Sequence, residues 1–449
     1  MAVRILITAL LLALVVVFPL ANVSGAQVPR ELPTPFPSSV GVPEPDDPTV
    51  VWLASDQNIS RADAARRAAW QLRAGVLIDK ARPALGGRFG GIWIDEQDYG
   101  RIKVGMVDAT AADQGWVNAQ GFRGAADIVE VPRSLNDLET AAEWLWSRAL
   151  ELNQDTVDDG SGWTLGVGIT PSRSTVNLSV PPPMHVSDAQ RAFVDQAEKR
   201  YGEALFIEEY EAPPREGACT TINGQSYCDP PLRAGIAINH AGGGTCTGAF
   251  PARSRSDNKL YQLTAGHCTR NRENVWRTRF PNNSVHDIGA VHNCRAGRGP
   301  ANNCSQGGAD YAILRVNNPS GWSQGRGWVF VRASGSHDGV PGTNRDPSYE
   351  MRNVSRVSEG WRVCKSGRHS TSCGRIFDLG YSYTSGSGYS YAYLARARYC
   401  WRGGDSGAPV YAYHNAYGIH QGGISESCTG YFQSIVDAQN GLNVDVMLE

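Results

Sequence analysis

Two short blocks of this sequence could together perform nucleophilic catalysis. Gly404-Asp405-Ser406-Gly407 places a serine among glycines, and Thr264-Ala265-Gly266-His267-Cys268 places a histidine beside a cysteine. A serine hydroxyl attacks a carbonyl usefully only when a base takes its proton. Glycines around such a serine allow a tight turn that exposes Oγ and aims backbone N–H groups at one point. The two blocks predict acyl transfer, with Ser406 as the nucleophile and His267 as the base.

A third group is needed to orient the histidine, and Asp310 is the best placed. It opens the apolar run that follows in Tyr311–Leu314, so its carboxylate is expected to be partly buried. A buried carboxylate suits the role of holding an imidazole in one tautomer. Asp287 and Asp338 are the alternatives, and both lie in polar segments typical of solvated loops.

Five motifs of the back half occur together with this chemistry. They are Cys246-Thr247-Gly248-Ala249-Phe250, the His267 block, Asp310-Tyr311-Ala312, Cys364-Lys365-Ser366-Gly367, and Cys400 through Pro409. The order His267, Asp310, Ser406 is the chymotrypsin order. On these motifs, residues from about Gly217 to the C-terminus resemble a chymotrypsin-fold serine protease of the bacterial streptogrisin and α-lytic protease type. The resemblance implies an all-β protease domain of two six-stranded antiparallel β-barrels with the active site between them. It also implies an oxyanion hole built from the backbone N–H groups of Gly404 and Ser406.

The resemblance also assigns a substrate-binding strand. Gly418-Ile419-His420-Gln421-Gly422-Gly423 matches the strand that lines the first substrate pocket and pairs with the substrate backbone, so the substrate-binding residues are His420, Gln421, Gly422 and Gly423. Family members usually carry serine where Gln421 stands. His420 is similar to the histidine of the Gly-Ile-His motif in glutamyl endopeptidases, which implies a preference for acidic residues before the cleaved bond. The alternative is that His420 points into the barrel and that the pocket takes apolar side chains.

Asp405 is expected to serve structure rather than chemistry. In the family its carboxylate forms an internal ion pair that shapes the turn, commonly with an arginine after the first cysteine of the Cys364-type loop. Lys365 stands there in this chain and can supply charge, but not a bidentate fork. The remaining histidines His292, His337, His369 and His414 are expected at the surface.

The cysteines indicate an oxidising compartment. There are 10, and all lie at or after Cys219. An even number in an exported chain favours disulfides, and neither CxxC nor HExxH spacing occurs, so we expect no metal site and no cofactor. The resemblance favours Cys246 with Cys268, Cys364 with Cys373, and Cys400 with Cys428, which leaves the close pairs Cys219 with Cys228 and Cys294 with Cys304.

Charge divides the chain near Gly217. Residues 1–216 hold 19 Lys and Arg against 29 Asp and Glu, a net of −10, whereas residues 217–449 hold 23 against 15, a net of +8. The front half, residues 1–216, has no cysteine, and the back half, residues 217–449, contains all of them. Their opposite charges suggest two parts that bind each other and later separate. The alternative is that these charges serve solubility alone. No basic cluster alternates with aromatic residues, which argues against nucleic-acid binding.

The first 26 residues indicate export. Arg4 precedes an apolar run from Ile5 to Leu20, and small residues follow at Ser24-Gly25-Ala26. This pattern is typical of a secretory signal peptide, at 1–26, and the run is short for a membrane anchor, which is the alternative. At 449 residues the chain is long enough for two or three folded units.

Residues 27–216 are expected to be an α+β pro-region. A proline-rich linker at 29–48 is followed by a predicted helix at 64–77 and a hairpin at 91–95 and 101–107. Next come a possible strand at 127–131, a helix at 135–152, a hairpin at 162–170 and 175–180, a helix at 187–201 and a strand at 204–209. The order of hairpin, helix and strand would then occur twice. In the α-lytic type the pro-region assists folding and occupies the cleft, so we expect residues 204–216 to present the chain's own substrate strand. An independent second enzyme is the alternative, and no motif supports it.

The sequence predicts a secreted, extracellular serine endopeptidase within residues 217–449. Its partners are expected to be protein or peptide substrates and its own pro-region, with no stable membrane association and a monomeric mature form. A pseudoprotease acting as a protein-binding module is the rival from another class. An esterase is disfavoured because Gly404-Asp405-Ser406-Gly407 is not a Gly-x-Ser-x-Gly elbow and the order of the three residues differs.

Overall fold

A computed structural model describes residues 41–158, 163–210, 215–216, 231–240, 244–270, 275–279, 285–300, 302–305, 307–322, 325–331 and 346–449. All of them belong to one compact unit, residues 32–449. The predicted signal peptide, Asp338, and Cys219 with Cys228 lie outside the described residues.

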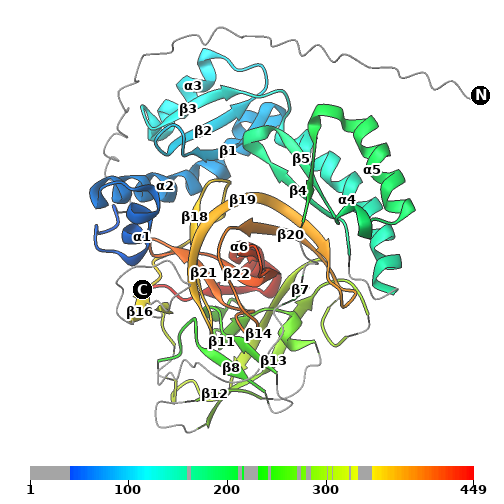
Figure 1. The fold of residues 1–449 in the computed structure, drawn as a ribbon. Coiled ribbons are helices and arrows are strands. Elements are labelled where there is room, and N and C mark those ends of the chain that lie inside the picture. Colours follow the sequence, from blue (N-terminus) through cyan, green and yellow to red (C-terminus); the bar gives the residue numbers. More distant parts are fainter. Residues whose placement is uncertain are drawn as a thin grey trace, which may run out of the picture. The chain divides into compact units, whose positions relative to one another are not determined.

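The front half contains two small α+β lobes (Figure 1). In each lobe a hairpin is followed by a helix and by a strand that pairs in parallel with the second hairpin strand. The hairpin, helix and strand order therefore occurs twice, although the sequence did not predict the helix of the first copy. The first lobe is α1 (Pro48–Gln57), α2 (Arg61–Leu85), β1 (Phe89–Asp95), β2 (Arg101–Met106), α3 (Ala111–Val117) and β3 (Ala126–Glu130). The second is α4 (Leu135–Asp158), β4 (Gly166–Thr170), β5 (Thr175–Val180), α5 (Asp188–Tyr201) and β6 (Leu205–Glu209).

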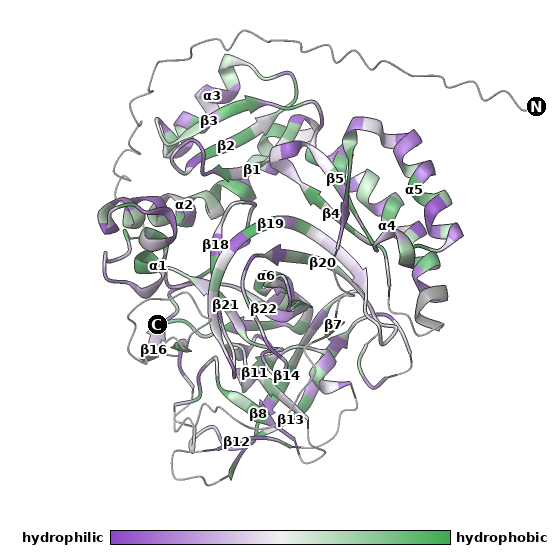
Figure 2. Ribbon diagram, viewed as in Figure 1, coloured by the Kyte–Doolittle hydropathy of each residue, from purple (hydrophilic) through white to green (hydrophobic). Residues whose placement is uncertain are grey.

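Local signals account for most of these boundaries. The Ser60 side chain caps α2 by accepting the N–H of Asp63, and Ser187 with Gln190 forms a capping box at the start of α5. Figure 2 shows hydrophilic and hydrophobic residues alternating along α5, whose Phe193 and Ala197 are buried. Two helices were not predicted: α3 spans only 7 residues, and α1 begins at Pro48, the last residue assigned to the linker.

The back half is mostly β, which agrees with the predicted fold class. One sheet has eight strands along the path β24-β10-β11-β14-β13-β12-β8-β9. Their bounds are Val444–Val446, Pro251–Ser254, Leu260–Thr264, Asp310–Val316, Val285–Ala296, Trp276–Arg279, Ala237–Asn239 and Thr245–Thr247. A separate pair is β15 (Trp328–Val331) with β16 (Asp346–Glu350).

Six further strands of the back half form a closed ring. The path runs β18-β21-β22-β23-β20-β19, and β18 also pairs with β19, which closes it. The strands are β18 (Arg362–Ser366), β21 (Pro409–Ala412), β22 (Asn415–Ile424), β23 (Thr429–Ser434), β20 (Ser390–Ala397) and β19 (Thr371–Thr384). The short β17 (Asn353–Val354) pairs with β22, and the helix α6 (Ile435–Leu442), expected from the sequence near Ser434, follows β23.

The front half joins this ring by strand pairing. β4 pairs antiparallel with β19, at Ile169 with Leu379 and Val167 with Ser382, so the second front sheet continues the sheet of the ring. Polar contacts reinforce the junction, because Asn153 and Thr164 of the front half bond to the side chain and carbonyl of Thr384. We call this junction between β4–β6 and β19–β20 the seam.

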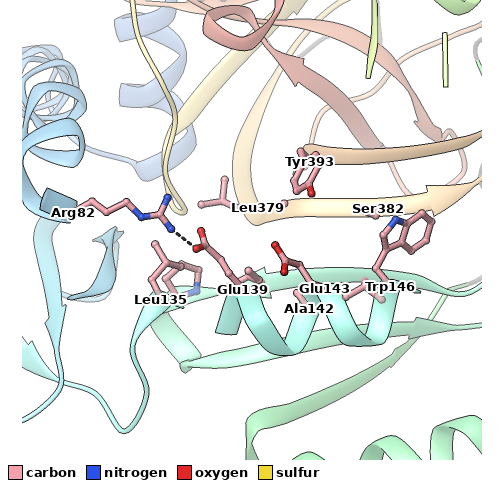
Figure 3. A pocket seen from close by; sticks show the side chains of 13 residues that line it. Arg82, Leu135, Glu139, Ala142, Glu143, Trp146, Leu379, Ser382 and Tyr393 are labelled. Atoms are coloured by element: carbon pink, nitrogen blue, oxygen red, sulfur yellow. Dashed lines mark hydrogen bonds and ion pairs between the residues drawn. The ribbon is translucent and has the colours of Figure 1, made fainter. Parts of the chain in front are cut away.

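A cavity of about 410 Å³ lies between α4, β4 and the strands β19 and β20. Figure 3 shows Glu139 and Glu143 of α4 reaching from one side of it toward Leu379 and Ser382, with Tyr393 near them. The ion pair of Arg82 with Glu139 lies at this cavity. The strand pairing at the seam therefore does not exclude all space between the two halves.

Candidate active site

The carboxylate of Asp310 holds His267 at two points. Asp310 opens β14 and is 0% exposed. Its Oδ1 accepts the backbone N–H of His267 at 2.7 Å, and its Oδ2 lies 2.7 Å from His267 Nδ1. His267 follows directly on β11, and β11 pairs with β14, so one strand pair brings both residues together. The ring of His267 is thereby oriented with Nδ1 toward a buried carboxylate.

Ser406 lies in a tight turn between β20 and β21. Gly404 and Gly407 on either side have φ of 96° and 86°, a conformation that favours glycine. A Cβ at Gly407 would lie 2.2 Å from the carbonyl oxygen of Thr247, so no side chain fits there. The Ser406 hydroxyl donates to the carbonyl of Gln421 at 3.2 Å.

The serine turn packs against the segments that carry His267. The Thr247 N–H donates to the Ser406 carbonyl at 2.7 Å, and the Thr264 hydroxyl donates to the Thr247 carbonyl at 2.9 Å. The disulfide of Cys246 with Cys268 links β9 to the helical turn His267–Thr269, and Cys268 Sγ lies 3.9 Å from the Ser406 carbonyl oxygen. Three distant parts of the sequence therefore meet at one place.

Of the two rival acids, Asp287 does not contact the histidine, and Asp338 lies outside the described residues. Asp287 lies in β13, is about half exposed on its side chain and pairs with Arg277 at 2.8 Å. Among the described residues, the carboxylate that contacts His267 is that of Asp310.

Lys365 and Asp405 form a buried ion pair beneath the serine turn. Lys365 Nζ lies 2.6 Å from Asp405 Oδ2, and both side chains are 0% exposed. Ser370 donates to the same Oδ2 at 2.6 Å, and the His369 N–H donates to Oδ1 at 2.7 Å. Burial by itself would raise the pKa of Asp405, but the Lys365 charge and these hydrogen bonds lower it. Lysine thus supplies the charge for which the family commonly uses arginine.

The predicted substrate-binding strand is β22, beside the serine turn. His420 accepts the Gly407 N–H on its carbonyl at 2.8 Å and is itself 0% exposed. Its Nδ1 lies 3.0 Å from the Tyr399 hydroxyl, while its Nε2 has no hydrogen-bond partner among the described residues. Burial lowers the pKa of His420 well below its usual value, so the ring is neutral near pH 7.

Gln421 is also fully buried. Its Oε1 accepts from the Tyr383 hydroxyl at 2.8 Å, and its Nε2 has no partner among the described residues. Tyr399 and Tyr383, the partners of His420 and Gln421, were not anticipated. Aromatic residues in strands are ordinary, and no sequence signal distinguishes those whose hydroxyl groups serve a site.

A short front-half strand lies along the end of β22. β7 (Arg215–Glu216) pairs antiparallel with β22, at Glu216 with Gly422 and Arg215 with Gly423. Gly422 and Gly423 are therefore already paired with a backbone strand from the chain's own front half.

The described cysteines form four disulfides, and these are the three pairs that the resemblance favoured together with one of the two pairs left over; the other, Cys219 with Cys228, stays a prediction. The four disulfides are Cys246–Cys268, Cys294–Cys304, Cys364–Cys373 and Cys400–Cys428. Within the described part of the chain, no three His, Cys, Asp or Glu side chains are grouped as a metal ion would require. No helix there is long and apolar enough to cross a membrane.

His414 departs from expectation. It was expected at the surface, but it is only partly exposed, and its Nε2 lies 3.2 Å from Asp47 at the start of α1. The hydroxyl of Tyr349 donates to the same carboxylate at 2.7 Å. The sequence could not indicate this contact, because its partners are separated by more than 300 residues.

Comparison with known proteins shows the family of this chain. Serine protease 2 of Streptomyces fradiae is 32% identical over 199 residues, which is 44% of this chain and 98% of that protein. This chain belongs to the same family of chymotrypsin-like serine proteases. The enzyme is a serine endopeptidase whose substrates are proteins or peptides. No model of a protein family matches the chain.

Solved structures of the streptogrisin and α-lytic type are also similar. A glutamic acid-specific serine protease described as using a histidine triad in substrate binding is 23% identical, covers 48% of this chain and 100% of its own, and has a TM-score of 0.35. Thermobifida fusca protease A is 19% identical, covers 49% and 99%, and has a TM-score of 0.37. These TM-scores are low, so the family assignment rests on the sequence match.

Replacing Lys365 by methionine should destabilise the fold. The change leaves Asp405 buried without its counter-charge, which typically costs about 3–5 kcal/mol. Guanidinium unfolding of the protease followed by tryptophan fluorescence measures the loss. Lys365→Arg keeps the charge and should recover part of the loss. Lys259→Met removes a lysine that is 47% exposed and pairs with Asp257, so it should cost little. Equal costs for Lys365→Met and Lys259→Met would contradict the role of the buried pair.

Proposed function

We propose that Ser406, His267 and Asp310 form the catalytic triad of a secreted serine endopeptidase made as a precursor. The observation that carries this proposal is the two-point contact of Asp310 with His267 beside the Ser406 turn. Two six-stranded barrels with the site between them belong to the same proposal. The closed ring of six strands supports the second barrel.

The proposed chemistry is acyl transfer. His267 takes the proton of Ser406 as Oγ attacks the scissile carbonyl, and it returns that proton to the leaving amine. Asp310 keeps the imidazole oriented and stabilises its protonated form. The backbone N–H groups of Gly404 and Ser406 receive the negative oxygen, where one such donor is typically worth about 3–4 kcal/mol in the transition state.

The front half, residues 27–216, acts as a pro-region in this proposal. Each ion pair that the structure describes between the two halves joins an acid of the front half to a base of the protease. Arg362 lies 3.0 Å from both Asp56 and Glu96, Arg396 contacts Glu208, and His414 contacts Asp47. The net charges of −10 and +8 therefore have a local counterpart.

The pro-region also blocks the cleft in this proposal. The pairing of Arg215 and Glu216 with Gly423 and Gly422 is the pairing expected of a bound substrate strand. The chain's own backbone would then occupy the substrate site until residues near Gly217 are cut and the front half leaves. Export through the signal peptide at 1–26 fits the four disulfides of the back half.

A preference for acidic residues before the cleaved bond is the finer part of the proposal. If the Tyr399 hydroxyl donates to Nδ1 of His420, the ring proton lies on Nε2, a buried donor without a described partner. A substrate carboxylate would satisfy that donor. The rival function, a pseudoprotease that only binds proteins, is disfavoured because Asp310 orients the imidazole of His267 and because the Ser406 turn packs against Thr247 in the same region.

Ser406→Ala should abolish peptide hydrolysis without unfolding the protein. Loss of the nucleophile of such a triad typically lowers kcat by about 10⁶-fold. The measurement is hydrolysis of a chromogenic peptide by the purified enzyme, with circular dichroism as the test of folding. Ser256→Ala, at an exposed loop serine, is the matched control and should keep full activity. Labelling of the parent by a fluorophosphonate separates the enzyme from a pseudoprotease, and persistent hydrolysis by Ser406→Ala would refute the assignment.

Tetrapeptide substrates that differ only before the cleaved bond should reveal a preference for Glu over Leu. A hydrogen bond to a charged group is worth about 1.5–3 kcal/mol, which corresponds to a ratio of kcat/KM of about 10–150. His420→Leu should remove the ratio, and His420→Gln should keep part of it. Because the pKa of His420 is lowered well below its usual value, the neutral ring is the donor, and the ratio should not fall as pH rises from 6 to 8. A parent enzyme that prefers Leu would refute the acidic preference.

Residues 217–449 expressed and exported without the front half should give little active enzyme. The missing front half removes the strand pairing at β19 and the contacts to Arg362 and Arg396. Active-site titration of the secreted product measures the yield, and supplying residues 27–216 on a second chain should restore it. A full yield from residues 217–449 alone would exclude a folding role.

A further inference from the structure

One arginine serves two carboxylates at the seam. Arg396 of β20 donates through Nε to Asp378 of β19 at 2.8 Å, and its Nη2 contacts both Asp378 and Glu208 of β6. Arg396 is 4% exposed, Asp378 is 0% exposed, and the side chain of Glu208 is a quarter exposed. If both carboxylates are ionised, this buried cluster carries a net negative charge, which is unfavourable away from water.

The front half is what covers Asp378. Gly168 of β4 lies against its carboxylate so closely that a Cβ there would be 2.1 Å from Oδ2 and 2.4 Å from Oδ1. The pairs of Ile169 with Leu379 and Val167 with Ser382 hold β4 in this position. Separation of the front half would therefore return the Asp378 carboxylate to water and remove Glu208 from Arg396.

One oxygen of Asp378 lacks compensation in the docked state. Oδ2 accepts from Arg396, but Oδ1 has no hydrogen-bond partner among the described residues. Glu208, by contrast, also accepts from the Ser179 hydroxyl of β5 at 2.6 Å. A carboxylate oxygen that is buried without a donor is costly when ionised, so Asp378 is the member of the cluster that a proton would neutralise.

The charges around the cluster also favour protonation of Asp378 rather than Glu208. Burial raises the pKa of Asp378 to about 7 despite the opposing effect of Arg396, and the nearby acids Glu208 and Glu359 raise it further. Burial would also raise the pKa of Glu208, but Arg396 and the hydrogen bonds lower it, with a contribution from Arg398. The ionisable groups around the cluster come from several elements. They are Arg396 and Arg398 from β20 and its end, Tyr381 from β19, Tyr431 from β23, Glu208 from β6, and Glu359 from the segment before β18, which Arg375 and Arg173 face in turn.

We propose that docking of the front half on β19 and β20 is coupled to the uptake of one proton by Asp378, so that acid holds the two halves together and a rise in pH through neutrality loosens them. This proposal rests on the proposed function in one respect, namely that the front half is the piece that must leave. It adds a regulatory property to the seam: the pH of the surroundings would decide how firmly the front half is held.

The direction follows from the protons bound in each state. In the separated state Asp378 is a solvated carboxylate beside Arg396, with a pKa near or below the ordinary value of about 3.9. Between about pH 4 and about pH 7 the docked state binds one more proton than the separated state, so docking weakens about tenfold for each unit by which pH rises. Above this window neither state holds the proton and docking is weakest. Below it both states hold the proton, so Asp378 contributes no further dependence on pH.

Hydrogen exchange of the full chain tests the coupling. Ser406→Ala is the parent, because it prevents self-cleavage, and mass spectrometry follows the peptide that contains β4 and β5. After correction for intrinsic exchange, the opening constant of this peptide should rise about tenfold per unit between pH 5 and 7 and level off above pH 7. Peptides from β14, inside the protease half, are the internal reference. Asp378→Asn, added to the parent, should remove the rise.

Matched variants separate Asp378 from the other acids of the chain. Asp287→Asn changes an exposed acid away from the seam and should keep the parent's rise. If Asp378→Asn fails to fold, Glu208→Gln serves instead. It removes the negative charge of Glu208 from the cluster, so the rise of the opening constant with pH should occur at lower pH. A parent without a rise, or an unchanged rise in Asp378→Asn or in Glu208→Gln, would overturn the proposal. Peptide hydrolysis by the unmutated chain is measured separately, so a failure of the proposed function would appear there and would leave the exchange result interpretable.

Discussion

The contact between Asp310 and His267 is the interaction on which the site depends. A carboxylate with no exposure to water is tolerated only when its oxygens are satisfied, and here one histidine satisfies both, through its backbone N–H and its ring Nδ1. The pairing of β11 with β14 fixes the two residues relative to each other. The disulfide of Cys246 with Cys268 and the contacts of Thr247 then bring the Ser406 turn to the same place.

Compensation of buried charge recurs elsewhere in the fold. Asp405 is held by Lys365 and Ser370, and Asp47 by Thr49, Tyr349 and His414. Arg362 is 7% exposed and contacts two acids of the front half, while Gln71 bonds to its backbone N–H and carbonyl. Asp378 differs from these groups because one of its oxygens lacks a described partner, and it lies where the front half joins the ring. A buried carboxylate whose charge is only partly compensated is the group at which binding of a proton would most favour the association of the two halves.

Two kinds of contact join the halves: backbone pairing of strands and ion pairs between particular side chains. Pairing of β4 with β19 satisfies backbone groups without regard to side chains, whereas the contacts of Arg362 and Arg396 with front-half acids require particular charges at particular places. Burial of Tyr210 among Tyr381, Tyr383, Tyr391 and Tyr431 adds apolar area at the same junction. These contacts involve groups of the protease that would become exposed once the front half departs.

Most of the local elements could be read from the sequence, which also predicted the reactive groups that we propose. Helix caps, alternation and glycine positions act over a few residues, which is why the helix predicted at 187–201 and the strand predicted at 204–209 correspond to α5 and β6 within one residue. The 7-residue α3 was missed because so short a helix carries little periodic signal. The helix α1 was missed because Pro48 was assigned to the proline-rich linker, whereas it is the first residue of a helix that Asp47 caps. The two blocks of the site, and the choice of Asp310 rather than Asp287, were likewise predictable from residue type and neighbouring sequence.

Other contacts appear only in the folded structure. Tyr399 bonds to His420 and Tyr383 to Gln421, Arg396 is shared by two acids, and His414 contacts Asp47. Such partners lie tens or hundreds of residues apart, and their meeting depends on the packing of whole strands, for which no single stretch of sequence carries a signal.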